Sequence, residues 1–218
     1  MAKQVAHEIK NPLTPMRLSI QHLQRAIQTN APNVKELTQK VTHTLLEQID
    51  NLSHIASEFS NFAVMPKAVN EVIDLQDIVH HVVALFHENE SASITLREEA
   101  EKNLVFADKN QLIRVFNNII KNAIQAIPDD RAGEIDIRVR NHEHRIVVSV
   151  QDNGSGIPED QKDKVFVPNF TTKSSGMGIG LAMSKNIIES AGGYIWFESE
   201  YGEGTTFYVE LPIYTGNA

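Results

Sequence analysis

Two glycine-rich segments in the second half of the chain have the composition of loops that bind phosphate. Residues 152–158 (DNGSGIP) follow an apolar run, and residues 176–181 (GMGIGL) precede a helical pattern. Glycine lets the backbone approach a ligand closely, and the free amides of a helix N-terminus favour phosphate. Ordinary turn glycines explain either segment alone equally well, and neither segment matches a Walker lysine loop or the Rossmann order.

Two asparagines on one predicted helix are candidate metal ligands. Asn118 and Asn122 lie four residues apart, so they share one face of a helix expected over residues 108–127. Amide oxygens are hard ligands that suit a Mg²⁺ ion bridging phosphates. Because the net charge is −8, bound phosphate would need such an ion. The alternative, that both are exposed polar residues without a function, is weakened by the apolar character of much of this helix.

The order of these motifs resembles the ATP-binding domain of sensor histidine kinases. NNIIKNA, DNGSGIP, VFVPNFTTK and GMGIGLAMSKNIIESAGG follow one another in the family's order, and HEIKNPLT resembles the family's phosphoacceptor motif. HEIKNPLTP together with FTTK looks most like the nitrogen-regulation branch. The resemblance covers nearly the whole chain. It implies a dimeric helical hairpin that carries the phosphorylated histidine, followed by an α/β sandwich that binds ATP, as in gyrase, Hsp90 and MutL.

The resemblance also implies roles for individual residues. Asn122 would coordinate Mg²⁺, Asn118 would support the phosphates, and Asp152 would accept a hydrogen bond from the exocyclic amine of adenine. Lys173 would contact phosphate from a mobile lid and so take part in catalysis. The other positions that the resemblance places at the nucleotide, the lid phenylalanines included, are Gly154, Gly156, Ile157, Phe166, Phe170, Thr172, Gly176, Gly178, Gly180 and Leu181.

His7 is the predicted phosphoacceptor. It follows Ala6, which belongs to an apolar stripe, so its side chain is expected to project beside that stripe toward water. A neutral imidazole, with an ordinary pKa of about 6.5, is a competent nucleophile near pH 7. Glu8 would accept the imidazole proton or orient the ring. Asn11, four residues beyond His7, matches a position that in relatives positions water to dephosphorylate the partner protein.

Three features qualify the resemblance. Gln125 stands where the family often has a basic residue, so no phosphate contact is expected from it. Only six residues precede His7, whereas family members usually have a sensory region upstream, so we expect a catalytic core whose signal input and any membrane anchor lie outside it. No receiver module is evident. The phosphoryl group is therefore expected to pass to a separate response-regulator receiver domain.

The elements that must position these residues begin with two long helices. Apolar residues over positions 2–27 recur at alternating steps of four and three, which is a heptad seam. Its continuity through Pro12 and Pro15 favours a kinked but unbroken helix. A second apolar periodicity covers residues 34–62. Each of two helices in a hairpin buries only one stripe, so a homodimer that forms a four-helix bundle is expected.

The remainder of the chain mixes helices and strands after a linker around Pro66. Helices are expected over residues 75–86, 108–127 and 181–191, and strands over residues 93–98, 134–140, 145–151, 194–199 and 205–211. The predicted fold class is therefore α+β. A helical hairpin occupies residues 1–66, and an α/β sandwich occupies residues 67–218.

Composition excludes several kinds of site and partner. The 218 residues include no cysteine, which excludes disulfides, thiolate metal sites and thiol nucleophiles. A net charge of −8 provides no global positive field for nucleic acid. No apolar run approaches the roughly 18–20 residues of a membrane span, and the first residues lack the apolar core of a signal peptide. We therefore expect a soluble, cytoplasmic core that binds no nucleic acid.

The motifs favour an ATP-dependent protein histidine autokinase that phosphorylates His7 and passes the phosphoryl group to an aspartate of a response regulator. Two alternatives keep the same ATP-binding fold. A related ATPase or serine kinase is disfavoured by the HEIKNP hairpin, which those relatives lack. A dimeric scaffold that binds nucleotide without catalysis is disfavoured because His7, Glu8, Asn122, Asp152 and the glycines are all present.

Overall fold

The chain folds into two compact units. In the computed structural model the described residues are 2–63, 67–87, 91–168, 170–171 and 178–216, with side chains described from residue 9 onward except at residues 54–63. Met1–Met65 make up most of the first unit, and Pro66–Phe170 with Gly178–Ala218 make up the second. Among the described helices, none is both long and apolar enough to cross a membrane.

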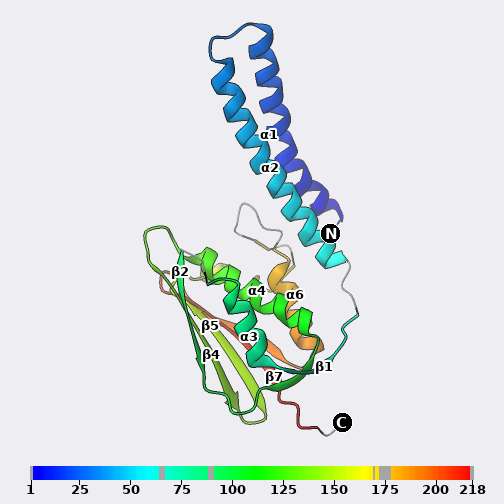
Figure 1. Ribbon diagram of the computed structural model, residues 1–218, viewed down its shortest axis with the longest axis vertical. Helices are drawn as coiled ribbons and strands as arrows, with labels where there is room; N and C mark the ends of the chain where they lie inside the picture. Colours follow the sequence, from blue (N-terminus) through cyan, green and yellow to red (C-terminus); the bar gives the residue numbers. More distant parts are fainter. Residues whose placement is uncertain (1, 64–66, 88–90, 169, 172–177, 217–218) are drawn as a thin grey trace. The chain divides into compact units, whose positions relative to one another are not determined.

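The first unit is an antiparallel pair of long helices, α1 (Ala2–Gln28) and α2 (Val34–Ala63) (Figure 1). Helix α1 continues through both of its prolines, so the prediction of an unbroken helix is confirmed. Helix α2 runs to Ala63, within one residue of the predicted apolar periodicity, because no glycine or proline interrupts it before Pro66. In the loop between the helices, the N–H of Ala31 donates to the carbonyl of Ala26 at 2.9 Å.

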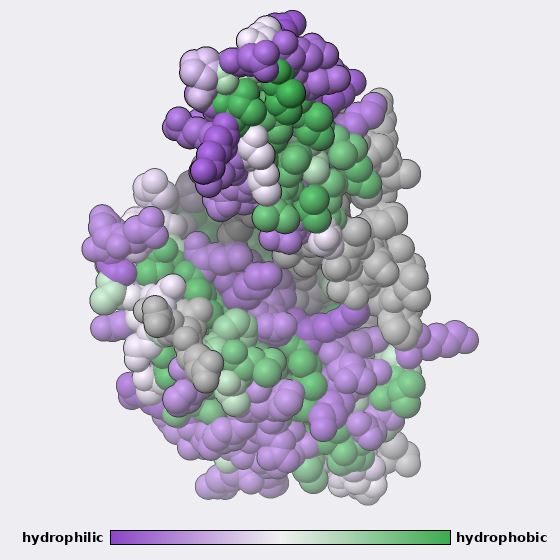
Figure 2. All heavy atoms as spheres, turned by 45° about the horizontal axis from the view of Figure 1, so that its top comes forward, coloured by the Kyte–Doolittle hydropathy of each residue, from purple (hydrophilic) through white to green (hydrophobic). Residues whose placement is uncertain are grey.

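The stripe of α1 that faces α2 coincides with the predicted seam only in part, at Met16 and Leu23. Its members are buried or half-buried and recur at steps of four and three: Pro12, Met16, Ser19, Leu23 and Ala26. Four seam residues instead remain 38–53% exposed: Ile9, Leu13, Ile20 and Ile27. Figure 2 shows hydrophobic side chains gathered along the hairpin. Helix α1 therefore carries two adjacent stripes, of which one packs on α2 and the other stays largely exposed among the described residues.

The second unit is a five-stranded sheet with helices on one face, beside a two-stranded sheet (Figure 1). The helices are α3 (Leu75–Ala84), α4 (Lys109–Ala126), α5 (Glu159–Lys162) and α6 (Gly180–Ser190). The strands are β1 (Glu71–Asp74), β2 (Ala92–Glu98), β3 (Leu104–Ala107), β4 (Gly133–His142), β5 (Arg145–Asp152), β6 (Tyr194–Glu200) and β7 (Gly204–Pro212). The large sheet has the order β2-β4-β5-β7-β6, with β2 parallel to β4 and the other pairs antiparallel.

Alternating side chains explain why the helices cover only one face of this sheet. In β4, Ile135, Ile137 and Val139 are buried, while the residues between them are charged. The buried rows pack against the apolar face of α4, including Phe116 and Ile119. The predicted α+β class is thus confirmed. Strands β1 and β3 and helix α5 were not predicted because each has only four residues, too few to display a periodicity.

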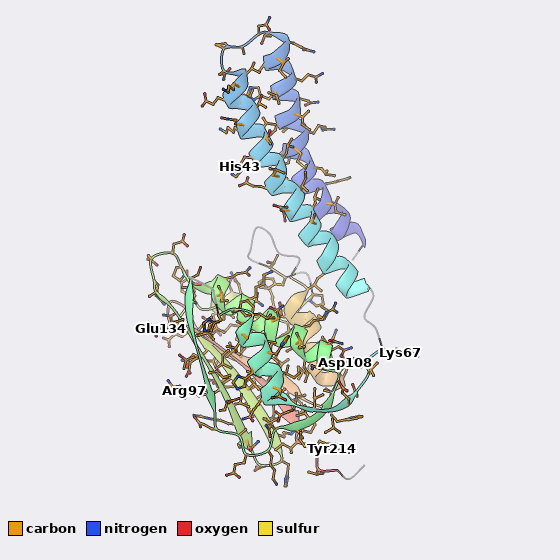
Figure 3. All side chains as sticks on the ribbon, in the orientation of Figure 1. His43, Lys67, Arg97, Asp108, Glu134 and Tyr214 are labelled. Atoms are coloured by element: carbon orange, nitrogen blue, oxygen red, sulfur yellow. The ribbon has the colours of Figure 1, made fainter. Side chains whose placement is uncertain are left out.

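Asp108 ties the start of the second unit to the N-terminus of α4 (Figure 3). Its Oδ1 accepts from the N–H of Gln111 at 3.0 Å, which is an N-cap, and its Oδ2 accepts from the N–H of Val69 at 2.8 Å. Burial raises the pKa of the Asp108 carboxyl, but backbone donors at Val69, Gln111 and Asn110 outweigh burial and hold the pKa below its ordinary value of 3.8. The charged form is therefore the one that the fold stabilises.

Asp108→Ala is expected to lower the free energy of unfolding of the second unit by about 1 kcal/mol, because the cap on α4 is lost. Asp108→Asn keeps an acceptor for Gln111 and should cost less. Since the folded pKa is lowered, the contribution is present above pH 3.8 and is lost as the pH falls through the lowered pKa. Denaturant titrations at about pH 7 and about pH 3 measure this difference. A gap between wild type and alanine variant that is as large at the lower pH contradicts the assignment.

Candidate functional site

The buried carboxylate of Asp152 is the centre of the site. Asp152 is the last residue of β5 and is only 4% exposed. Its Oδ1 accepts from two backbone N–H groups, those of Gly154 at 2.9 Å and Thr205 at 3.2 Å. A buried carboxylate is costly unless donors of this kind satisfy it. The segment that follows β5 and the start of β7 therefore hold the Asp152 side chain in one orientation.

The first glycine-rich segment runs between the end of α4 and the turn that joins β6 to β7. The N–H of Ser155 donates to the carbonyl of Ala126 at 2.9 Å, and a side chain at Gly154 would overlap the backbone of Ala126. Gly156 has a φ of 66° and lies against the backbone of Glu200, so both its conformation and its surroundings require glycine. These glycines let the loop pass close under any ligand bound at Asp152.

The residues that follow this loop belong to the core. The N–H of Ile157 donates to the Oγ of Ser199 at 2.8 Å, and the Ile157 side chain packs against the core. Phe166 is half-buried in an aromatic cluster, with ring centroids 5.9 Å from Phe197 and 6.5 Å from Phe207. Phe166 was predicted on the mobile lid from the resemblance. In the structure it is anchored to β6 and β7, and its contact with nucleotide stays a prediction.

Asn118 joins α4 to the N-terminus of α6. Its Nδ2 donates to the Oγ of Ser184 at 3.1 Å, and that hydroxyl donates to the carbonyl of Gly180 at 3.0 Å. A Cβ at position 180 would overlap the Asn118 amide, so glycine is needed for this close approach. Asn122 lies one turn along the same face of α4 and is half-buried. Asn118 is thus brought to the helix end that follows the second glycine-rich segment.

The described end of the second glycine-rich segment is shaped by close backbone contacts. Gly178 has a φ of 61° and lies against the backbone of Phe170, so the structure brings these two predicted site residues together. Gly180 begins α6, and Leu181 packs against the core. Residues 172–177 lie outside the described residues, and with them the predicted positions Thr172, Lys173 and Gly176.

The donor set fits an adenine nucleotide and a metal ion that is bound partly through phosphate. A buried carboxylate acceptor suits an amino purine, and the N-terminus of α6 suits phosphate. Asn118 and Asn122 supply amide oxygens, and Mg²⁺ usually completes its shell with phosphate oxygens and water. Among the described residues no group of three or more histidines and carboxylates could hold a metal on its own. A metal site made mainly by protein carboxylates is therefore not found there.

A hollow of about 340 Å³ lies beside the same strand ends but has a different chemistry. Its lining includes Asp152 itself and the three glutamates Glu198, Glu200 and Glu203, together with Ser199 and Thr206. These four carboxylates repel a triphosphate. Phosphates are therefore expected on the side of Asn118, Asn122 and the N-terminus of α6.

The predicted phosphoacceptor segment lies in the first turns of α1. His7 and Glu8 have helical backbone, but their side chains are outside the described residues. Asn11 is exposed, and helical spacing places it on the same face as His7. Pro12, directly after it, is buried in the hairpin.

Sequence reasoning missed three residues that build the site: Thr205, Ser184 and Arg131. Thr205 and Ser184 are buried and bond to predicted site residues. The only signal for Ser184 is its spacing of four from Gly180, which puts both on one face of a helix. Arg131 lies in a polar loop after α4 and donates to three backbone carbonyls that are distant in sequence. No local sequence pattern predicts such contacts.

Two family descriptions match the chain in the order of its two units. The His Kinase A (phospho-acceptor) domain matches residues 1–65, and the histidine kinase-, DNA gyrase B-, and HSP90-like ATPase matches residues 107–215. The second match covers the strands and helices that form the site around Asp152. The N-terminal match covers the helical pair and the HEIKNP segment.

Curated relatives align along nearly the whole chain. Nitrogen regulation protein NtrY of Azorhizobium caulinodans is 33% identical over 98% of this chain and 28% of its own length. Sensor histidine kinase ZraS of Escherichia coli is 35% identical over 98% of this chain and 45% of its own length. Sensory histidine kinase/phosphatase NtrB of Azospirillum brasilense is 30% identical over 98% of this chain and 55% of its own length. The chain thus spans between about a quarter and just over half of these relatives.

Solved structures agree with the fold and point to the same family. The histidine kinase ThkA, in complex with the response regulator protein TrrA, covers 98% of this chain with a TM-score of 0.72 and 28% identity, over 61% of that chain. The catalytic domain of ThkA covers 66% of this chain and 95% of its own, with a TM-score of 0.59 and 33% identity. The order of phosphoacceptor helices and ATP-binding sheet, the motifs and these relatives agree: the chain belongs to the sensor histidine kinases and has relatives in their nitrogen-regulation branch.

Proposed function

We propose that the chain is the catalytic core of an ATP-dependent protein histidine autokinase. It phosphorylates His7 and passes the phosphoryl group to an aspartate on the receiver domain of a response regulator. The observation that carries the proposal is the buried carboxylate of Asp152, which accepts hydrogen bonds from Gly154 and Thr205. The same chain also carries the HEIKNP motif on helix α1. The family's two modules on one chain favour this activity over an ATPase, a serine kinase or a scaffold without catalysis.

Each part of the nucleotide site has a proposed task. Asp152 accepts a hydrogen bond from the exocyclic amine of adenine, which selects an amino purine over a keto purine. Asn122 coordinates Mg²⁺, Asn118 supports the phosphates, and Lys173 neutralises phosphate charge. Bound ATP and Mg²⁺ supply the transferable phosphoryl group and the charge that shields it. The proposed lining is completed by Gly154, Gly156, Ile157, Phe166, Phe170, Thr172, Gly176, Gly178, Gly180 and Leu181.

The phosphoacceptor helix has a separate task in this proposal. His7 attacks as the neutral imidazole, and Glu8 accepts its proton or orients the ring. Phosphoryl transfer depends mainly on positioning and charge neutralisation, so the helix needs to supply little further chemistry. We assign residues 1–66 to this dimerisation and phosphotransfer domain and residues 67–218 to the ATP-binding domain.

A second activity, dephosphorylation of the response regulator, is favoured by Asn11. This amide is exposed on α1, four residues beyond His7, where it can orient a water molecule toward a bound aspartyl phosphate. The Azospirillum brasilense relative is named a histidine kinase/phosphatase, which supports the same pairing of activities here. The proposed partners are therefore a receiver domain and a second copy of the chain. Because ATP is the phosphoryl donor, the proposed place of action is the cytoplasm.

His7→Gln is expected to abolish autophosphorylation, because glutamine offers no nucleophilic nitrogen, while ATP affinity stays within about twofold. Incubation with γ-labelled ATP and Mg²⁺ measures incorporation, and the label should be acid-labile and alkali-stable. The matched control is His43→Gln on α2, an exposed histidine 3.3 Å from Glu47 (Figure 3), which should keep full labelling. Label on the His7 variant would show that another residue is the acceptor.

Asp152→Asn and Asn122→Ala are expected to separate base binding from metal binding. Asp152→Asn should weaken ATP binding about tenfold or more both with and without Mg²⁺, because a charge-assisted hydrogen bond is lost. Asn122→Ala should remove mainly the part of the affinity that depends on Mg²⁺. Calorimetry under both conditions measures this, with the exposed Asp160→Asn on α5 as a control that should change nothing. Equal losses for Asn122→Ala with and without metal rule out its role as a ligand.

Ile20→Glu is expected to weaken a homodimer at least about tenfold, because the charge would be buried in the four-helix bundle. Ile20 is 50% exposed in the single chain and lies on the uncovered stripe of α1. His22→Glu adds the same charge on a different face of the helix and should leave the dimer unchanged. Sedimentation at several concentrations measures association, and circular dichroism checks that helix content is retained. A wild-type chain that stays monomeric at high concentration contradicts the bundle.

A further inference from the structure

Arg131 joins the two loops that orient Asp152. Its Nη1 donates to the carbonyls of Asn153 at 2.6 Å and Gly154 at 3.2 Å, and its Nη2 donates to the carbonyl of Gly202 at 3.1 Å. Asn153 and Gly154 belong to the first glycine-rich loop, whereas Gly202 belongs to the turn between β6 and β7. One guanidinium therefore spans segments that are about fifty residues apart in the sequence.

The two loops are also the source of the donors that hold the Asp152 carboxylate. The N–H of Gly154 comes from the first loop, and the N–H of Thr205 comes from the strand that leaves the second. A single backbone hydrogen bond, from the N–H of Gly202 to the carbonyl of Ser155 at 2.8 Å, joins the loops directly. Thr205 is held in register with Asp152 by the pairing of β5 and β7, so displacing the first loop would remove the Gly154 donor and leave the carboxylate with only part of its support.

Arg131 adds a side-chain link to contacts that already join the two loops, which include the bond from the N–H of Ile157 to the Oγ of Ser199 at 2.8 Å. The side chain of Asn153 is tied to the β4 side, where its Oδ1 accepts from the N–H of Glu134 at 2.9 Å and its Nδ2 donates to the carbonyl of Ala132 at 2.9 Å. These bonds secure the first loop to the start of β4 but do not reach the turn after β6. Arg131 lies in the loop before β4, so its side chain connects this secured loop to the turn.

We propose that Arg131 is a positioning residue of the nucleotide site, which clamps the first glycine-rich loop to the β6–β7 turn and thereby orients Asp152 for the adenine amine. The proposal rests on the proposed function, because it assumes that Asp152 binds the base. Arg131 touches neither base nor phosphate in this assignment. Its effect is on recognition of the base, so it should appear in affinity and base selectivity rather than in the rate of phosphoryl transfer at saturating ATP.

The planar fork of arginine is the property that this role requires. Its rigid donors reach carbonyls on two segments at once, whereas the lysine ammonium is a single point charge on a flexible stem. A purely electrostatic role, attraction of phosphate, would be served equally by lysine. Comparison of arginine with lysine at position 131 therefore distinguishes a positioning role from a purely electrostatic one.

Arg131→Ala is expected to weaken ATP binding about five- to tenfold, with inosine triphosphate affinity changed less than about twofold. Inosine carries an oxygen where adenine carries its amine, so it gains little from an oriented Asp152. The kcat of autophosphorylation at saturating ATP should stay within about twofold while KM rises. Arg131→Lys should recover only part of the ATP affinity. Full recovery by lysine, or equal losses for both nucleotides, overturns the clamp.

A double-mutant cycle tests whether Arg131 acts through Asp152. In an Asp152→Asn background, Arg131→Ala should cost less than about twofold in ATP affinity, because the orientation it provides no longer matters. Losses that multiply instead show independent roles and overturn the proposal. The matched control is Arg145→Ala. Arg145 also donates to a carbonyl, that of Gly192 at 3.4 Å, but it is the first residue of β5, whereas Asp152 is the last.

The two hypotheses fail in different ways in this experiment. If the wild-type chain does not bind ATP, the proposed function is wrong. If the wild type binds ATP and Arg131→Ala binds it equally well, only the inference about Arg131 is wrong. Thermal unfolding of each variant checks that the second unit is folded, which is expected because Arg131 is exposed and outside the core.

Discussion

The orientation of one buried carboxylate is the constraint on which the ATP-binding unit depends. Asp152 ends a strand in the middle of the sheet, where water cannot stabilise its charge, so backbone donors must do so. Those donors come from Gly154, in the turn that directly follows the strand, and from Thr205, the partner of Asp152 on the neighbouring strand β7. The close approach of Gly204 to the backbone of Asp152 follows from the same constraint, because a side chain there would overlap the carbonyl. The glycines therefore allow the close backbone approach that the carboxylate needs, as well as the close approach of a ligand.

Much of this arrangement could be predicted from the sequence because its parts are local. Asn118 and Asn122 share a helix face by spacing alone, and the alternation in β5 places Asp152 on the buried side. Contacts between distant segments could not be predicted in the same way. Arg131 and Gly202 are separated by 71 residues, and Asp152 and Thr205 by 53, so no periodicity connects them. Polar loop residues have no hydrophobic pattern that would reveal their partners.

The helical hairpin shows a different limit of sequence patterns. A heptad count detects apolar positions but does not say which neighbour each position meets. In α1 the stripe that packs on α2 includes Pro12 and Ser19, which are not counted as hydrophobic residues in a heptad pattern. Ile20 and Ile27, which are counted, stay exposed. Two stripes about a quarter turn apart are what a helix in a four-helix bundle needs, since it has one neighbour in its own chain and further neighbours in the other.

Binding a triphosphate to a chain of net charge −8 requires that attraction be local. The glutamates of the acidic hollow, Glu198, Glu200 and Glu203, gather near the ends of β6 and β7. The amides of Asn118 and Asn122 and the N-terminus of α6 belong to the helices instead. Asp152 lies at the end of β5, where two backbone donors offset the negative charge of its carboxylate. In the proposed assignment, one small domain would recognise an uncharged base with a carboxylate and a polyanion with helix ends and a cation.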